Sequence, residues 1–267
     1  MHHTDLHTHT TFSDGRSTME EMVLSAIKKG LTSYGIADHC YTPYDLDYCI
    51  QKDQFPAYKA EFQRLKALYG DRIDLYLGIE WDGFCELPDR SDYDYVLGDC
   101  HYVKKDGLYL TVDGSPEEQK QHLMEHFGGD LLAYARCYFD GYVSCAEANH
   151  PDFLGHFDLL TKFGLFDETD PKYRSLALEA LEASLKAVPI LEMNTGAISR
   201  GYKALPYPAD FLLKAVPEFG GKFILSSDSH HADNVAYKFD LCRDLLLAAG
   251  IKSTVIYEKG RFEEAAL

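Results

Sequence analysis

Short apolar runs alternate with longer amphipathic segments along the whole 267-residue chain. The apolar runs predict seven strands, at residues 4–8, 33–38, 74–80, 93–99, 153–156, 190–194 and 223–227. Between them, apolar residues at helical spacing predict helices near residues 55–69, 116–139, 172–187, 209–217 and 234–249. A strand followed each time by a helix is typical of a mostly parallel sheet, and seven such strands suggest a (β/α) barrel.

Several residues mark where these elements start and stop. The clearest helix opens at Ser17, where Ser-Thr-Met-Glu has the form of a capping box, and Gly30 is its natural end. The Gly128-Gly129 pair predicts a break in the helix at residues 116–139. Residues 104–115, with two Asp-Gly pairs, predict a hairpin or an excursion after the fourth strand.

Composition restricts the class of protein. With 46% hydrophobic residues, a chain of this length can form one α/β domain, which we expect over residues 1–267. We find no apolar run long enough to cross a bilayer and no N-terminal export signal. The seven cysteines are odd in number and scattered, without C-x-x-C spacing, which indicates reduced thiols and a cytoplasmic location.

The formal net charge of -17 argues against an extended nucleic-acid partner, because most of the surface would repel a polyanion. A small anionic substrate remains compatible with this charge. Bound divalent cations can reverse the local field at a site even on a strongly acidic molecule.

Histidines and carboxylates gather where the predicted strands end, which is the place where barrel enzymes carry their active sites. In the first and last of these clusters two ligands stand two residues apart, so that both face the same side of the strand. The candidate metal ligands are His7, His9, Asp14, His39, Glu80, His101, His156, Asp228 and His230.

Imidazole and carboxylate groups are the usual ligands of first-row divalent metals. One ion needs only three or four protein ligands, so this set predicts more than one ion. A carboxylate such as Glu80 can bridge two metals, and a water held between them becomes a hydroxide nucleophile. A single histidine is more often a packing or surface residue. Chance alone does not readily place metal-binding side chains at the ends of six predicted strands.

The ordered ligand set resembles the PHP family, named for polymerase and histidinol phosphatase, over nearly the whole chain. Within that family, the Ser-Asp-Ser-His sequence at residues 227–230 and the phrase Glu-Met-Asn-Thr-Gly at residues 192–196 look like the stand-alone bacterial histidinol-phosphate phosphatases. The resemblance implies a distorted seven-stranded barrel with three divalent metal ions. It also implies hydrolysis of L-histidinol phosphate to L-histidinol and phosphate in histidine biosynthesis, by attack of a metal-bridging hydroxide.

The resemblance also assigns ligands to each ion. One ion would be held by His7, His9, Glu80 and Asp228, a second by Glu80, His101 and His156, and the third by Asp14, His39 and His230. Some relatives have histidine in place of Asp14, so this site is harder in ligand character, and Zn, Mn and Fe all remain candidates.

Catalysis and substrate binding require groups besides the metals. Glu80 and Asp228 would act through the metal centre, and either Asp228 or His231 could protonate the leaving alkoxide. After the sixth strand, Arg200 is the preferred phosphate ligand because its planar fork suits two oxygens. Further candidates for the substrate are Asn194, Ser199, Lys203 and Lys162 for the phosphate, and Trp81, Tyr41, Tyr44, Asp45 and Asp82 for the histidinol moiety.

Two other functions fit the same residues. The metals could serve a phosphoesterase that acts on a nucleoside phosphate or another small phosphate ester. A metal-binding or regulatory module that has lost catalysis is the second alternative, and it is disfavoured because every ligand position holds a competent side chain.

Overall fold

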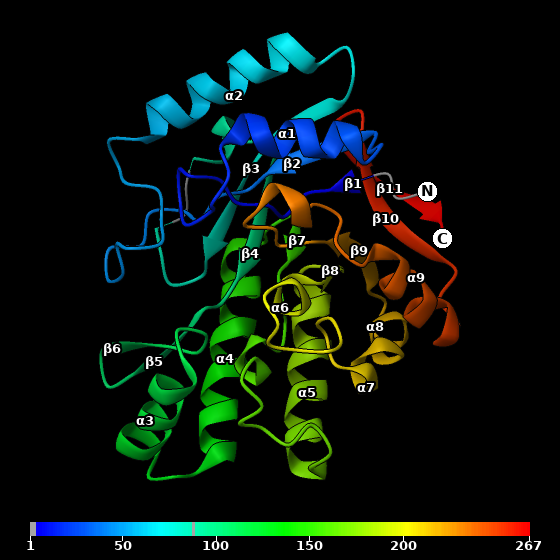
Figure 1. Cartoon of the computed structure of the whole chain (residues 1–267). Helices are drawn as coiled ribbons and strands as arrows, with labels where there is room; N and C mark the ends of the chain where they lie inside the picture. The colour runs from blue at the N-terminus through cyan, green and yellow to red at the C-terminus, as the bar shows by residue number, and fades with distance from the viewer. Residues whose placement is uncertain (1–3, 87–88) are drawn as a thin grey trace.

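The computed structural model describes residues 4–86 and 89–267, and its centre is a curled sheet (Figure 1). The order of strands in this sheet is β1-β2-β3-β4-β7-β8-β9-β10-β11. All neighbouring strands are parallel except β10 and β11. The bounds are β1 (Thr4–Asp5), β2 (Ser33–Ile36), β3 (Asp74–Asp82), β4 (Tyr95–Asp99), β7 (Phe153–Leu154), β8 (Ile190–Asn194), β9 (Lys222–Ser226), β10 (Ser253–Glu258) and β11 (Arg261–Ala266).

The seven predicted strands are all present in the predicted order, but the predicted number was wrong, because the sheet has nine strands. The two extra strands form a C-terminal hairpin whose turn contains Lys259 and Gly260, both with positive φ. All six residues of β11 are at least partly exposed and three are charged, so its sequence lacks the apolar alternation by which a strand is recognised.

The sheet curls because its first strand returns toward its later ones. A parallel bridge joins Thr8 to Ser229, and the amide of His9 donates to the carbonyl of Ser229 at 2.9 Å. The segments after β1 and β9 therefore lie together, and the carboxyl ends of the parallel strands surround one region of the molecule.

Helices cover the outside of the sheet (Figure 1). Their bounds are α1 (Met19–Lys28), α2 (Phe55–Tyr69), α3 (Pro116–Phe127), α4 (Leu131–Asn149), α5 (Pro171–Ala187), α6 (Gly196–Ser199), α7 (Asp210–Leu213), α8 (Ala215–Glu218) and α9 (Phe239–Ala248), with short 3-10 turns at η1 (Arg90–Asp92), η2 (Leu159–Thr161) and η3 (Ala232–Asn234). The predicted break at Gly128-Gly129 is confirmed, since both glycines have positive φ. The helix predicted at 209–217 is divided into α7 and α8.

The capping box at the start of α1 is displaced by one residue from the predicted one. Thr18 is the N-cap: its hydroxyl accepts the amide of Glu21, whose carboxylate accepts the amide of Thr18. The hydroxyl of Ser17 instead accepts the amide of Ala232 at 3.1 Å. Ser17 is therefore used to attach the segment that follows β9.

The hairpin predicted near residues 104–115 is present as β5 (Tyr102–Lys105) and β6 (Leu108–Thr111), which form a separate two-stranded sheet. Its tight turn contains Asp106 and Gly107, both with positive φ, as the Asp-Gly pair predicts. The side chain of Tyr109 on β6 stacks on Tyr44, with ring centroids 3.9 Å apart. The hairpin thereby packs on the loop that follows β2.

Three apolar clusters hold these layers together. One lies between the sheet and α4, α5 and α9, and a second lies under α1 and α2. The third contains residues of β3, β4, β7, β9 and β10, including Tyr95 and Tyr257. Among the described residues, no helix has both the length and the apolar character that a membrane crossing requires.

Candidate metal centre

The nine candidate ligands lie together at the carboxyl ends of the parallel strands. Their side chains form overlapping groups in which the possible ligand atoms are within 4.8 Å of one another. These groups are His9, Asp14, His39 and His230; Glu80, Asp99, His101 and His156; His7, His156 and Asp228; and His7, His9 and Glu80. The convergence expected from the sequence is therefore present, and it includes one residue that was not expected, Asp99.

Glu80 of β3 is at the centre of the cluster and is 1% exposed. Its Oε1 lies 3.0 Å from Nε2 of His7 and 3.3 Å from Nε2 of His156. Its Oε2 lies 2.6 Å from Nδ1 of His39 and 3.4 Å from Nε2 of His9. Because the two oxygens face different imidazoles, this carboxylate can bridge two ions.

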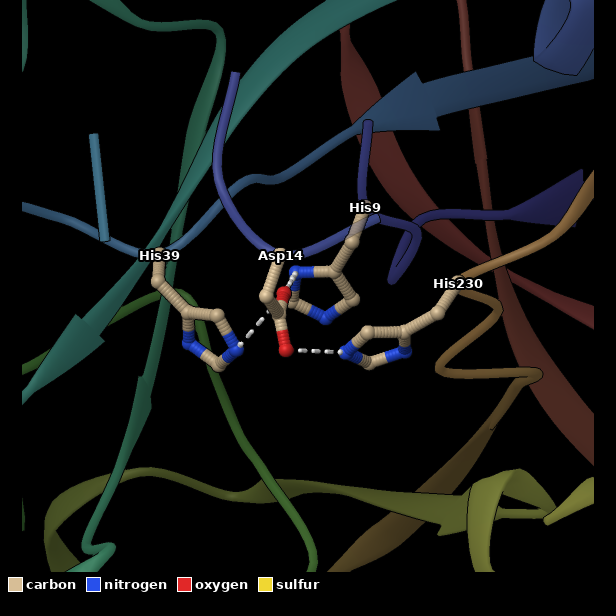
Figure 2. Close-up of side chains that lie close together, drawn as sticks. All are labelled: His9, Asp14, His39 and His230. Carbon is tan, nitrogen blue, oxygen red and sulfur yellow. Dashed lines mark ion pairs between the residues drawn. The ribbon is translucent and has the colours of Figure 1, made fainter. Parts of the chain in front are cut away.

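Figure 2 shows the carboxylate of Asp14 between the rings of His39 and His230. Oδ1 of Asp14 lies 3.6 Å from Nε2 of His39, and Oδ2 lies 3.0 Å from Nε2 of His230. The ring of His9 stacks against both other rings, with centroids 4.3 and 4.1 Å away. These residues come from the segments that follow β1, β2 and β9, so the curl of the sheet brings them together.

Unpartnered buried atoms test whether the cluster suits metal ions. Nε2 of His7, both ring nitrogens of His9 and Oε2 of Glu80 are buried and make no well-aligned hydrogen bond, although other ring nitrogens and carboxylate oxygens lie close to them. A buried polar atom without a partner costs about 1–3 kcal/mol, so several such atoms in one place require compensation. Cations held among them would supply it, and the residues fit divalent metals.

The protonation states of two members of the cluster, His9 and Glu80, suit metal ligands. Burial and the neighbouring rings of His230 and His39 lower the pKa of His9 to about 3, so that its ring is neutral at physiological pH. Burial opposes ionisation of Glu80, but His39 and His7 hold its pKa well below the ordinary value. A neutral imidazole and an ionised carboxylate are the forms that bind metals.

Glu192 of β8 belongs to the phrase at residues 192–196 but was not among the predicted site residues, and it contacts two of the candidate ligands. Its Oε2 lies 2.8 Å from Nδ1 of His7, and its Oε1 accepts the amide of His156 at 2.7 Å. A proton on Nδ1 of His7 leaves Nε2 free to face Glu80. Glu192 lies two residues before Asn194 on the same face of the strand, and this spacing could have revealed it.

A pocket of about 690 Å³ opens above the cluster. Its walls combine ligand residues with basic, acidic and aromatic side chains. It is lined by Asp14, His39, His101, His156, Asp228 and His230, by Arg16, Lys162, Arg200 and His231, by Asp45, Asp47 and Asp113, and by Tyr48, Tyr102 and Tyr202 among others.

Three of the predicted phosphate ligands, Arg200, Lys162 and Ser199, line this pocket. Nη2 of Arg200 lies 2.9 Å from Oδ2 of Asp228, and its Nη1 lies 2.9 Å from Nδ1 of His230. Lys162 donates to the backbone carbonyl of Asp113 at 2.9 Å. Arg200 therefore contacts two residues of the cluster, and both cations line the pocket.

Two other predicted substrate residues do not reach the pocket. Trp81 is 1% exposed, and its indole donates to the carbonyl of Cys85 at 3.2 Å. Neighbouring residues of a strand point to opposite faces, so Glu80 and Trp81 cannot both face the cluster. Asn194 is fully buried and donates to Glu192 at 2.7 Å and to Asp228 at 3.3 Å, so it supports the ligands from behind.

Of the other candidates for substrate contacts, some line the pocket and others hold neighbouring segments in place. Asp45 lines the pocket and accepts the hydroxyl of Tyr102 at 2.9 Å. Asp82 accepts the hydroxyl of Tyr44 at 3.0 Å and the amide of His101 at 2.7 Å, which fixes the segment that carries this ligand. Lys203 donates to Thr161 and Glu168, both at 2.7 Å.

The chain is similar to curated relatives and to solved structures. The chain is 31% identical over 245 residues to a protein assigned as a histidinol-phosphatase in Deinococcus radiodurans, with 88% of this chain and 89% of that protein covered. It is 29% identical to a protein with the same assignment in Schizosaccharomyces pombe, with 91% and 84% covered.

Its fold is similar to that of a histidinol phosphate phosphatase from Lactococcus lactis, whose structure contains zinc, L-histidinol and phosphate. The TM-score is 0.70 at 21% identity, and 98% of each chain is covered. The PHP domain matches residues 5–196, which include seven of the nine candidate ligands, all but Asp228 and His230. The chain therefore belongs to the PHP family.

Proposed function

We propose that this protein is a metal-dependent phosphomonoesterase that hydrolyses L-histidinol phosphate to L-histidinol and phosphate in histidine biosynthesis. The observation that carries the proposal is a buried cluster of histidines and carboxylates beneath a pocket with basic side chains. The assignments of the relatives in Deinococcus radiodurans and Schizosaccharomyces pombe support the substrate.

Three divalent ions are proposed, with the ligands divided as the family resemblance implies. Glu80, with each oxygen beside different imidazoles, is the proposed shared ligand. Such ions polarise phosphoryl oxygens and lower the pKa of bound water. The lactococcal structure contains zinc, which makes Zn²⁺ a reasonable ion for the experiments below.

Arg200 and Lys162 are the proposed ligands of the phosphate. Arg200 is paired with Asp228 in this structure, and its guanidinium can form two parallel hydrogen bonds with phosphate oxygens. We expect it to exchange one or both carboxylate contacts for the substrate. Lys162 adds a second positive charge to the same pocket.

His231 is the better candidate for protonating the leaving alkoxide. It lines the pocket, and the amide of Asp233 lies 3.2 Å from its Nδ1, so Nε2 is the nitrogen that would donate the proton once the ring has taken up a second one. Burial opposes ionisation of Asp228, but Arg200 and His7 hold its pKa well below the ordinary value. An ionised carboxylate has no proton to donate.

The acidic and aromatic wall of the pocket suits the rest of the substrate. Histidinol carries a cationic amine and an imidazole ring, and the wall offers the carboxylates of Asp45 and Asp47 beside Tyr48 and Tyr102. A carboxylate pairs with the amine, and an aromatic ring offers its face to a cation or a second ring.

The alternative, another small phosphate ester such as a nucleoside monophosphate, has less support. Turnover of histidinol phosphate and of a nucleoside monophosphate, each with and without a chelator, tests both proposals. We expect histidinol phosphate to be preferred and chelation to abolish its hydrolysis. Preference for the nucleotide would overturn the substrate assignment, and activity after complete metal removal would overturn the metal-dependent mechanism.

A cytoplasmic location is proposed from the cysteines. All seven are unpaired, and six of them are buried. Unpaired buried thiols are typical of proteins kept in a reducing compartment. The net charge of -17 supports a small phosphate ester over a nucleic-acid polymer as the partner.

A further inference from the structure

Asp99, the last residue of β4, lies in the cluster but is outside the ligand set implied by the family resemblance. It is 2% exposed. Its Oδ1 lies 3.3 Å from Nδ1 of His101, and its Oδ2 lies 3.5 Å from Nε2 of His156. Both oxygens are buried, and neither makes a well-aligned hydrogen bond with the imidazole that it faces. These contacts therefore compensate the burial of the carboxylate only in part.

The oxygen Oδ2 faces the same imidazole nitrogen as Glu80 does. Nε2 of His156 lies 3.3 Å from Oε1 of Glu80, and Nε2 of His101 lies 3.8 Å from that oxygen. Possible ligand atoms of Glu80, Asp99, His101 and His156 are all within 4.8 Å of one another. This separation is compatible with four ligands around one ion.

Packing holds Asp99 against the cluster. A Cβ atom at residue 155 would lie 2.9 Å from Cβ of Asp99, so the glycine at this position is what allows the close approach of β4 and the segment after β7. Two carboxylates buried together repel each other, and a divalent cation between them would remove the repulsion.

We propose that Asp99 is a further metal ligand, whose Oδ2 joins Glu80, His101 and His156 around one ion while Oδ1 remains directed at His101. The inference rests on the metal centre of the proposed function and adds a residue to it. The ion would have four protein ligands, two of them carboxylates, so this position should retain its metal strongly.

Zinc retention tests the proposal in solution. The protein and its Asp99→Asn and Asp99→Ala variants would be loaded with Zn²⁺ and dialysed against a chelator, and the remaining zinc counted by mass spectrometry. Asp158→Asn is the matched control, because Asp158 is also fully buried and its Oδ2 accepts the amide of Ala209 at 3.0 Å. We expect both Asp99 variants to lose about one equivalent more zinc than the control.

Crystals of the zinc-loaded protein give the second readout. We expect an Asp99 oxygen at about 2.0–2.2 Å from a zinc ion, the usual distance for a carboxylate ligand. Asp99→Asn keeps the volume of the side chain and one acceptor oxygen. If Asp99→Ala failed to fold, zinc retention could still be measured on Asp99→Asn.

Two results would overturn the proposal: equal zinc retention by Asp99→Asn and Asp158→Asn, or Asp99 oxygens more than about 3 Å from every zinc ion in the crystals. Neither measurement uses a phosphate ester. Failure of the substrate assignment would therefore leave the role of Asp99 intact, and failure of the Asp99 proposal would leave phosphatase activity to be decided by turnover.

Discussion

Glu80 is surrounded by imidazoles from three other segments, and each of its oxygens faces a different pair of them. Replacing Glu80 with alanine would leave these ligands without their shared carboxylate. We expect Glu80→Ala to lose metal and to lower kcat by about 100-fold or more, because ions and ligands no longer share one centre. Metal counting and steady-state kinetics on the same preparation measure both effects.

Glu80→Gln is the control for shape, since it keeps the volume and removes the charge. We expect it to retain more metal than Glu80→Ala and to remain strongly impaired. Full metal content together with normal rates in Glu80→Ala would contradict the bridging role.

Arg200 contacts two ligand residues and also lines the pocket, so its contribution has two parts. We expect Arg200→Ala to lower kcat/KM by about 100-fold while most of the metal is kept, because the loss is in binding of the charged phosphoryl group. Arg200→Lys should restore only part of this loss, since an ammonium lacks the planar fork.

The matched control is Arg136→Ala, which removes an exposed arginine that faces Glu179 on the outer helices. It should leave kcat/KM unchanged. An Arg200→Ala variant that lost metal as completely as Glu80→Ala would show that Arg200 acts on the ligands and not on the phosphate.

At the scale of the elements, the strands that end in candidate ligands were predicted well, because one sequence pattern marks both the strand and the ligand that follows it. An apolar run identifies the strand, and the first polar residues after it identify its carboxyl end, as at His39 and His101. Parallel strands bring these ends together in any closed or curled sheet. Fold and ligand cluster were therefore predictable from the same pattern.

The residues that support the cluster were less predictable, because their roles depend on which face of a strand they occupy in three dimensions. Trp81 follows Glu80 in sequence but packs away from the cluster, whereas Asp99 points into it. The strands β10 and β11 were missed since β11 is stabilised by pairing with β10 and carries charged residues on an exposed edge.

The start of α1 offers a test at the scale of one element. Thr18 and Glu21 form a reciprocal capping box a few residues after Asp14. We expect Thr18→Ala to lower the free energy of unfolding by about 1 kcal/mol, because the amide of Glu21 loses its partner. Chemical denaturation measures the change, and Lys28→Ala on the exposed side of the same helix is the control.

A Thr18→Ala variant as stable as the Lys28→Ala control would show that the capping box contributes nothing measurable. Thr18→Ser, which preserves the hydroxyl, should recover most of the lost stability.

For the molecule as a whole, the two ends of the curled sheet have different tasks. The carboxyl ends of the strands carry polar groups that are short of partners, and such groups cost stability until cations occupy the cluster. The opposite end is filled by aromatic side chains, and the C-terminal hairpin contributes Tyr257 to them. The contacts that stabilise the fold are thus distant from the candidate metal centre.

Tyr257 allows this separation to be measured. It is 4% exposed, its ring lies 4.7 Å from that of Tyr76 and 4.5 Å from that of Phe262, and its hydroxyl donates to the carbonyl of Asp94 at 2.9 Å. These contacts are at the amino ends of β3 and β4, away from the ligands. We expect Tyr257→Ala to lower the free energy of unfolding by about 3 kcal/mol, through lost apolar contacts and the cavity left behind.

Tyr257→Phe separates the hydrogen bond from the packing and should cost only about 1 kcal/mol. Denaturant unfolding measures both costs, while metal content and kcat are followed under conditions where each variant is folded. Since the ring does not contact the cluster, both variants should keep full metal content and a normal kcat. Loss of metal from folded Tyr257→Ala would instead mean that packing at the aromatic end of the sheet sets the geometry of the ligands at the carboxyl end. This ring does not contact the cluster, so it could influence the ions only through a shift in the positions of the strands.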